Sequence, residues 1–246
     1  MSDDMAVRQK VALVFGGSRG IGAAAATRLV QDGFAVALTY VSRPDKAEQL
    51  VRTIEEGGGR ALAVEADSAD PAAIRAAVAR TVQRFGPIDA VVVNAGILRL
   101  ATVDAFGLED LDRMLAINIR GVFLAIQAAT AQMRDGGRVI TIGSNTAIRA
   151  SIRGSSVYAM TKAAVATMVK GIALDLAPRR ITVNNIQPGP IDTDMTEGHI
   201  PALTGMVPLG RVGQPREVAT LVSYLAGDES GYMTGASLTI DGGFVL

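Results

Sequence analysis

Short runs of apolar residues alternate along the chain with longer stretches of helical periodicity. Seven of these runs are predicted to be strands, and several of the seven are nearly continuous Val, Ile, Ala and Leu, which is typical of strands covered on both faces by crossover helices. The predicted strands are Val11–Phe15, Ala35–Tyr40, Ala61–Val64, Ala90–Val93, Val139–Ile142, Ile181–Ile186 and Ser237–Ile240. The predicted helices between them are Gly20–Gln31, Asp45–Glu56, Pro71–Arg84, Leu108–Met133, Val157–Ala177 and Pro215–Ala226. This alternation predicts one α/β domain over residues 1–246, a doubly wound sheet of about seven parallel strands with helices on both faces.

One stretch carries neither pattern. It runs from Asp192 to Arg211, before the last predicted helix, and is predicted to form a substrate lid at about residues 192–211. The helices Leu108–Met133 and Val157–Ala177 are apolar over more than one face, which favours burial against a partner subunit. The residues concerned are Val122, Phe123, Ile126, Ala129, Val165, Met168, Val169 and Ile172.

Composition excludes several functional classes. The 246-residue chain is 49% hydrophobic, has a formal net charge of zero and lacks a basic run, so neither nucleic acid nor a membrane surface is a predicted partner. Without cysteine there is no thiolate chemistry, and the single histidine, His199, is predicted to be an exposed loop residue, so no metal site is expected. The polar segment Met1–Met5 is unlike a signal peptide, and no apolar run approaches membrane-spanning length. A cytoplasmic protein is expected.

The first predicted strand leads directly into a glycine-rich turn and an alanine-rich helix. The turn has the spacing G-x-x-x-G-x-G and contains Gly16, Ser18, Arg19, Gly20, Ile21 and Gly22. Glycines let backbone approach a phosphate closely, and the following helix N-terminus offers free N–H groups and the positive end of its dipole. The order of strand, turn and helix is the context in which such a turn binds a dinucleotide.

The end of the second predicted strand indicates which dinucleotide. An unphosphorylated adenosine ribose is usually bound by an Asp or Glu about 20 residues past the glycines. No acid occurs between positions 33 and 44, where Ser42 and Arg43 lie instead. Together with Arg19, these side chains favour a 2′-phosphate, so NADP(H) is predicted over NAD(H). Asp45 follows closely and is the alternative ribose contact.

Tyr158 and Lys162 lie four residues apart near the start of a predicted helix, so both side chains share one helical face. A free phenol has a pKa of about 10, which is too high for easy proton exchange at neutral pH. A lysine cation beside it favours the phenolate and is expected to lower that pKa. The pair therefore indicates a tuned proton donor and acceptor.

With four further motifs, these features resemble the short-chain dehydrogenase/reductase family over essentially the whole chain. The motifs are Val93-Asn94-Ala95-Gly96, then Asn118, then Ser144, then the loop with Pro188, Gly189, Ile191 and Thr193. Asp241-Gly242-Gly243 resembles the family's usual C-terminal end. The resemblance implies a Rossmann-type fold, a homotetramer, and hydride transfer between NADP(H) and a ketone, a 3-oxoacyl thioester or a secondary alcohol.

The resemblance also implies individual roles. Catalysis is assigned to Asn118, Ser144, Tyr158 and Lys162. Tyr158 donates the proton and Ser144 hydrogen-bonds the substrate oxygen. Lys162 binds the nicotinamide ribose, and Asn118 holds a water that connects Lys162 to solvent. The remaining cofactor contacts are the glycine turn, Asn94, Ala95 and Gly96, the loop from Pro188 to Thr193, and Asp67 and Ser68 near the adenine.

Two departures from the family pattern affect the site. Phe15 and Val93 replace hydrogen-bonding side chains, so a different loop geometry is expected there. The interval from Ser144 to Tyr158 is about one residue longer than usual, and it contains the alternative serines Ser151, Ser155 and Ser156. Ser144 is preferred because it directly follows a strand, and active groups of such sheets lie at strand C-termini.

Other interpretations stay open. A non-catalytic nucleotide-binding or sensor protein could keep the same fold, although it need not keep all four catalytic residues. A mainly structural oligomer subunit ranks below both. Arg134, Arg179 and Arg180 could bind an acidic carrier protein, although exposed arginines more often only solubilise.

Overall fold

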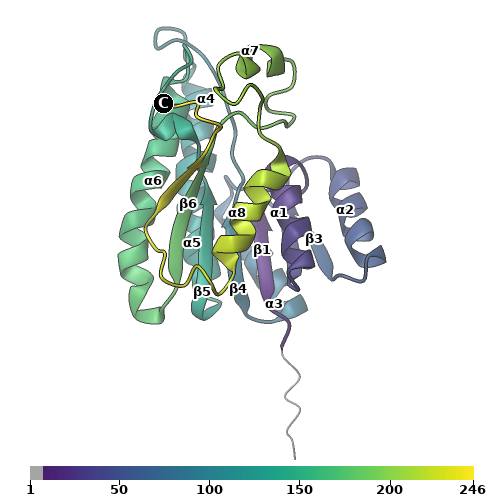
Figure 1. The fold of residues 1–246 in the computed structure, drawn as a ribbon. Helices are drawn as coiled ribbons and strands as arrows, with labels where there is room; N and C mark the ends of the chain where they lie inside the picture. The colour runs from purple at the N-terminus through teal and green to yellow at the C-terminus, as the bar shows by residue number, and fades with distance from the viewer. Residues whose placement is uncertain (1–7) are drawn as a thin grey trace, which may run out of the picture.

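Seven parallel strands form one sheet in the order β3-β2-β1-β4-β5-β6-β7 (Figure 1). The computed structural model describes residues 8–246, so the predicted feature at Met1–Met5 lies outside the described residues. The strands are β1 (Val11–Phe15), β2 (Ala35–Tyr40), β3 (Ala61–Glu65), β4 (Ile88–Val93), β5 (Met133–Ile142), β6 (Thr182–Pro188) and β7 (Ser237–Ile240). The order reverses between β1 and β4, which is where such sheets open a crevice for ligands. The predicted α/β fold class is confirmed.

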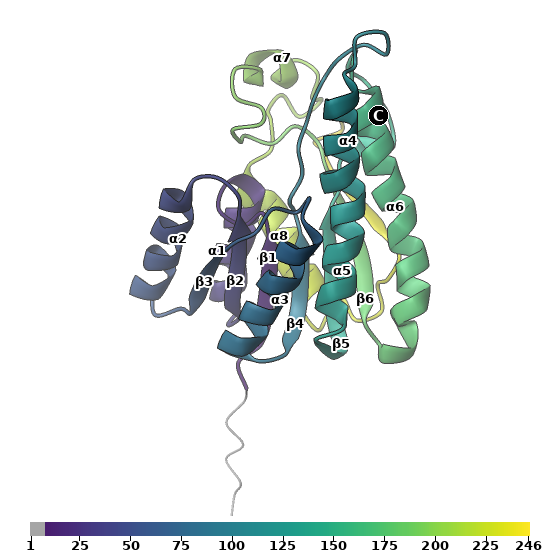
Figure 2. The ribbon, with the colours of Figure 1, turned by 180° about the vertical axis from the view of Figure 1, so that it is seen from behind.

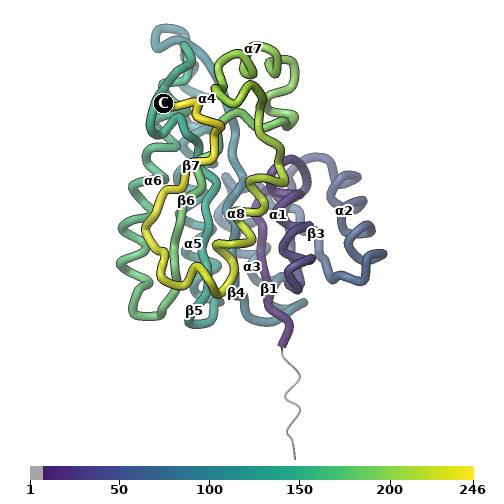
Figure 3. Tube along the Cα trace, in the orientation of Figure 1, coloured from purple at the N-terminus to yellow at the C-terminus, as the bar shows by residue number. Residues whose placement is uncertain are grey.

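Helices cover both faces of the sheet. Leu13 and Phe15 of β1 belong to the core shared with one set of helices, and Ala12 and Val14 to the core shared with the other. The first set is α3 (Pro71–Phe85), α5 (Val122–Thr130) and α6 (Ser156–Leu176), which stand together in Figure 2. The second set is α1 (Gly20–Gln31) and α8 (Pro215–Ala226), with α2 (Pro44–Glu56) beside them near the β3 edge (Figure 3). The side-chain alternation of each strand thus feeds two cores.

The predicted helix Leu108–Met133 is wrong as a single element. It is divided into α4 (Leu108–Leu115), the π-helical segment η1 (Ala116–Gly121) and α5, which ends at Thr130. Met133 instead begins β5 and pairs with Ile88 of β4. No Gly or Pro stop signal marks this change, so the sequence pattern could not show it; pairing with the neighbouring strand overrides local helix propensity.

The apolar residues that favoured a partner subunit are mostly internal. Six of the eight, from Val122 to Ile172, are buried in the chain's own core, and Met168 packs against it. Only Phe123 is exposed, at 43%, and Met160 and Leu174 of α6 are exposed besides. The interpretation of those eight residues as partner-facing is therefore wrong for all except Phe123.

The prediction that no apolar run approaches membrane-spanning length is also wrong. By length and composition alone, the helical segment Ser156–Arg179 could cross a membrane, with a mean hydropathy of 1.3 in its most apolar window. Core helices of other proteins pass the same test. This segment carries the buried Lys162 and packs Val165 and Val169 into the core beneath the sheet.

The predicted lid contains a helix that sequence pattern did not show, α7 (Ile200–Thr204). It lies above the carboxyl ends of the strands in Figure 1. Both ends of the lid are tied down, since Asp192 donates its N–H to the Gly213 carbonyl and Leu209 donates to the Gly242 carbonyl. His199 is exposed at the start of α7, as expected.

Candidate active site

The glycine turn between β1 and α1 is a cradle that side chains would fill. A Cβ on Gly22 would lie 2.1 Å from the Gly16 carbonyl oxygen, so only glycine fits there. Gly16 has a φ of +71°, and a Cβ there would lie 2.8 Å from the Cα of Ala95. These contacts bring bare backbone to the surface of the turn, directly before the N-terminus of α1, which suits a phosphate group.

Phe15 and Val93 leave the turn well supported. Thr39 of β2 accepts the Gly16 N–H at 2.9 Å through its hydroxyl, and the Asn94 amide donates to the Gly16 carbonyl at 2.7 Å. The carbonyl of Phe15 accepts the N–H groups of Asn94 and Ala95. The side chains of Phe15 and Val93 cannot form hydrogen bonds, but the side chains of Thr39 and Asn94 and the Phe15 carbonyl hold the turn in place.

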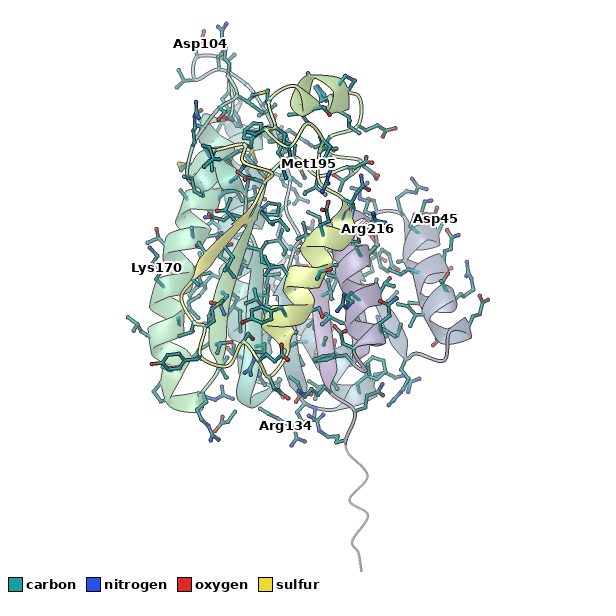
Figure 4. The ribbon with its side chains drawn as sticks, in the orientation of Figure 1. Asp45, Asp104, Arg134, Lys170, Met195 and Arg216 are labelled. Carbon is teal, nitrogen blue, oxygen red and sulfur yellow. The ribbon has the colours of Figure 1, made fainter. Side chains whose placement is uncertain are left out.

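A cleft of about 480 Å³ opens at this turn, at the carboxyl ends of the neighbouring strands β1 and β4. Twelve of the predicted cofactor residues line it: Gly16, Ser18, Arg19, Gly20, Ile21, Ser42, Asp67, Ser68, Asn94, Ala95, Gly96 and Thr193. The predicted residues Gly22, Arg43, Tyr158, Lys162, Pro188, Gly189 and Ile191 do not line this cleft. The sequence did not indicate the lining residues Thr39, Tyr40, Val41, Ala66, Ile97, Arg113, Ile117, Asp194 and Met195. Met195 is labelled in Figure 4.

Asp67 is fixed on one side of the cleft. Its Oδ1 accepts the Ala69 N–H at 2.9 Å, and its Oδ2 accepts from Arg113 of α4 at 2.8 Å. Burial opposes its ionisation, but the Ala69 and Arg113 hydrogen bonds outweigh burial and hold the pKa of Asp67 below its usual value. Asp67 therefore stays a charged acceptor next to Ser68, which is buried.

Both arginines predicted to receive a 2′-phosphate are paired with carboxylates. The Arg19 guanidinium donates to Asp194 of the lid at 3.0 Å. Arg43 has a φ of +67° and donates to both carboxylate oxygens of Asp45, at 3.1 and 2.9 Å. Arg43 therefore pairs with Asp45 and does not line the cleft, and a ribose contact by Asp45 stays a prediction.

Tyr158 and Lys162 share the first turns of α6, as their spacing predicts. Lys162 Nζ lies 5.5 Å from the centre of the Tyr158 ring and donates to the Ile142 carbonyl at 3.0 Å. It also lies 3.5 Å from where a Cβ on Gly96 would be, so it borders the wall of the cleft. The end of β5 and the Asn94–Gly96 segment thus hold the ammonium between them.

Burial governs the proton affinity of both side chains. It raises the pKa of Tyr158 to about 12, and hydrogen bonding with Ser144 opposes this rise. It lowers the pKa of Lys162 to about 8, because a buried ammonium loses its hydration. The expectation of a lowered phenol pKa is therefore wrong for the protein alone: desolvation of the phenol is the largest effect, and Lys162 does not offset it.

Among the four candidate serines, Ser144 is the one beside Tyr158. Its Oγ accepts hydrogen bonds from the N–H and hydroxyl of Thr146, at 3.2 and 3.0 Å. Ser155 donates to the Ile152 carbonyl at 2.6 Å, and Ser156 is exposed. The Ser151 hydroxyl is buried and has no hydrogen-bond partner among residues 8–246. Because Thr146 fills acceptor sites of Ser144, the proton of the Ser144 hydroxyl is available to the oxygen of Tyr158.

Asn118 lies in η1, where the wider π-helical turn interrupts the long helix; such turns are frequent at functional sites. Its side chain is buried and forms two hydrogen bonds of 2.9 Å with the backbone of Ile97, one in each direction. Its Oδ1 lies 3.4 Å from the position of a Cβ on Gly96, on the same side as Lys162. The main contact of Asn118 is therefore the chain that follows Gly96.

Of the four cofactor residues predicted at the end of β6 and in the loop after it, Thr193 lines the cleft, together with the neighbouring Asp194 and Met195. Gly189 donates to the Ile240 carbonyl, and a Cβ on it would lie 2.5 Å from the Cβ of Asp241. Ile191 is buried and bridges to Gly213. These residues hold the base of the lid in place.

Two of the three arginines considered for a carrier protein, Arg134 and Arg179, lie away from this site. Figure 4 labels Arg134 at the opposite end of the molecule from Met195. Arg179, which lies between α6 and β6, donates to the carbonyls of Thr130 and Met133 and to Asp135, at the junction of α5 and β5. Arg179 therefore has a structural role in joining these segments, and its binding of a carrier protein stays a prediction.

Comparison with known proteins places the chain in a family. The family model described as enoyl-(acyl carrier protein) reductase matches residues 16–245. A cyclic-di-GMP-binding biofilm dispersal mediator protein of Escherichia coli is 43% identical over 96% of this chain and 97% of its own. A short-chain dehydrogenase/reductase of Serratia marcescens superposes with a TM-score of 0.95 at 50% identity, covering 97% of this chain and 99% of its own. A short-chain dehydrogenase of Burkholderia cenocepacia, solved with NADP, gives 0.94 at 45% identity, covering 97% and 99%. This chain therefore belongs to the short-chain dehydrogenase/reductase family.

Proposed function

We propose that this protein transfers a hydride between NADP(H) and a carbonyl or secondary alcohol substrate, with Tyr158 as the proton donor and acceptor. The observation that carries the proposal is the meeting of Ser144, Tyr158 and Lys162 at the carboxyl end of β5, beside a cleft built for a dinucleotide. The Burkholderia neighbour solved with NADP supports the choice of cofactor.

The residues present fit that cofactor. The glycine turn and the N-terminus of α1 would hold the pyrophosphate, Asp67 would accept from the adenine amino group, and Lys162 would bind the nicotinamide ribose. Thr193, which follows the loop that begins at Pro188, would contact the nicotinamide amide. The bound nicotinamide supplies or accepts the hydride, and the protein supplies position and proton transfer.

Tyr158 suits the donor role because burial keeps its proton in place. With a pKa raised to about 12, the phenol is protonated throughout the physiological range and can deliver that proton to an alkoxide. Ser144 would direct its free hydroxyl proton to the same oxygen, placing the oxygen near Tyr158. Lys162 would stabilise the phenolate that remains, since a cation nearby favours the charged form.

Replacement of the proton requires a route to solvent. Asn118 would hold a water that connects Lys162 to solvent, which is supported by the closeness of Asn118 Oδ1 and Lys162 Nζ to the same point above Gly96. The two side-chain bonds of Asn118 to Ile97 leave its Oδ1 one further lone pair for such a water.

The test is Tyr158→Phe, assayed by loss of NADPH absorbance with a panel of ketones and 3-oxoacyl thioesters. We expect kcat to fall by about 100-fold or more while the Kd for NADPH changes little, because only the proton-transferring hydroxyl is removed. Lys162→Ala should impair both quantities. A Tyr158→Phe enzyme with more than about a tenth of wild-type kcat would rule out Tyr158 as the essential acid.

A second candidate function is supported by the relative named as a cyclic-di-GMP-binding protein. It matches the alternative of a non-catalytic nucleotide sensor. Calorimetric titration of the protein with cyclic di-GMP and with NADPH separates the two. Tight binding of cyclic di-GMP, together with no turnover of any carbonyl in the panel, would favour the sensor.

A homotetramer in the cytoplasm is proposed as the assembly and location. The exposed apolar side chains Phe123, Met160 and Leu174, on the outer surface of α5 and α6, support a subunit interface there. Light scattering at micromolar concentration tests it, and a monomeric mass would contradict it. A purely structural subunit remains the lowest-ranked alternative.

A further inference from the structure

The charged side chains that line the dinucleotide cleft form two ion pairs. Asp67 pairs with Arg113 at 2.8 Å, and Arg19 pairs with Asp194 at 3.0 Å. Within residues 8–246, these four are the only ionic residues among those lining the cleft, so the lining has a formal charge of zero. A phosphorylated dinucleotide brings several negative charges, and both arginines that line the cleft already have a carboxylate partner.

The Arg19–Asp194 pair joins two separate parts of the fold. Arg19 lies in the glycine turn, and Asp194 lies in the lid, which follows β6. The adjacent Thr193 places its Cγ2 3.2 Å from the position of a Cβ on Gly20, so lid and turn are in contact at this point. The pKa of Arg43 is raised chiefly by its hydrogen bond with Asp45 and to a smaller extent by the charge of Asp194. Asp194 therefore acts electrostatically on both arginines at this end of the cleft.

We propose that Asp194 is a specificity-determining residue that competes with the cofactor's 2′-phosphate for the Arg19 guanidinium. The inference rests on the proposed use of NADP(H). The Asp194 carboxylate occupies one N–H of the Arg19 guanidinium and neutralises its charge, so a 2′-phosphate that binds Arg19 competes with this carboxylate. A dinucleotide without this phosphate does not need Arg19. Asp194 thus weakens the binding of NADP(H) more than that of NAD(H), and it reduces the preference of the protein for NADP(H).

The expected effect is modest because both partners are exposed, with 58% and 65% of their side chains accessible. Exposed ion pairs of this kind change an equilibrium constant by a factor of about 1.4 to 5. Asp194→Asn, which keeps the shape and removes the charge, should lower the Kd for NADPH by about threefold. The Kd for NADH should change by less than about 1.5-fold, and the difference should shrink as salt is added.

The experiment is a double-mutant cycle read by titrating the fluorescence of bound NADPH and NADH. The proteins are wild type, Asp194→Asn, Arg19→Gln and the double variant, with Glu197→Gln as the matched control. Glu197 is also an exposed carboxylate of the lid, and within the described residues its side chain makes no ion pair. The control should bind both dinucleotides like wild type.

The Arg19→Gln background decides the mechanism. If Asp194 acts by occupying Arg19, Asp194→Asn should tighten NADPH binding about threefold in the wild-type protein. The same change in the Arg19→Gln protein should leave NADPH binding nearly unchanged. An equal gain for NADPH and NADH, or the same gain with and without Arg19, would overturn the inference. A wild-type protein that binds neither dinucleotide would instead overturn the proposed function itself, so the two failures are distinguishable.

Discussion

We expect Lys162 to make a measurable contribution to the pH dependence of stability. Its side chain is 6% exposed and its pKa falls from 10.5 to about 8 on folding, because burial removes the hydration of the ammonium. Between these two values the unfolded chain binds a proton that the folded chain does not. Stability must therefore rise with pH across this window, which is opposite to the usual effect of a lysine in an ion pair.

The magnitude follows from the two pKa values. The full difference corresponds to about 3 kcal/mol of folding free energy lost at neutral pH. Moving from about pH 7 to pH 9.5 recovers about 2 kcal/mol of this, since the folded form is then largely deprotonated while the unfolded form is not. The hydrogen bond to the Ile142 carbonyl at 3.0 Å favours the ammonium and makes this an upper value. Above about pH 10, Tyr158 acts in the opposite direction, because its pKa is raised on folding.

The assay is urea unfolding of the cofactor-free protein at fixed protein concentration, comparing wild type with Lys162→Met at about pH 7 and pH 9.5. Methionine keeps most of the side-chain volume and cannot titrate. The difference in unfolding free energy between the two proteins should shift by up to about 2 kcal/mol in favour of wild type at the higher pH. If the unfolding free energies of the two proteins change equally between the two pH values, or if wild type loses stability relative to the variant, Lys162 does not have a lowered pKa in the folded protein.

Three further changes test the rest of the site and its support. Ser144→Ala should lower kcat by about 100-fold in a ketone-reduction assay, whereas Ser155→Ala should change kcat by less than about threefold. Equal losses of kcat in the two variants would show that Ser144 is not the residue that hydrogen-bonds the substrate oxygen. Gly121→Ala should destabilise the protein by more than about 2 kcal/mol in urea unfolding, because the added Cβ would lie 2.2 Å from the Ser68 carbonyl oxygen. A Gly121→Ala protein as stable as wild type would show that η1 can move to accept the methyl group. Arg179→Ala should cost about 2 kcal/mol by releasing the Thr130 and Met133 carbonyls, with no change in the KM of either substrate.

The sequence by itself determined the parts of the protein that depend on local pattern. Nearly continuous apolar runs predicted all seven strands, and three of them have the predicted bounds. The glycine spacing predicted a turn in which Gly22 tolerates no side chain. The four-residue interval placed Tyr158 and Lys162 on one helical face, since helical geometry alone fixes that relation.

The tertiary structure decided whatever depends on neighbours distant in sequence. Pairing with Ile88 turned Met133 from a predicted helix end into the start of β5. The partner of Arg19 is Asp194, 175 residues away, and only the placement of the lid on the glycine turn brings the two charges together. The pKa values of Tyr158 and Lys162 follow from burial, which a four-residue spacing cannot show, because desolvation is a property of everything packed around a group.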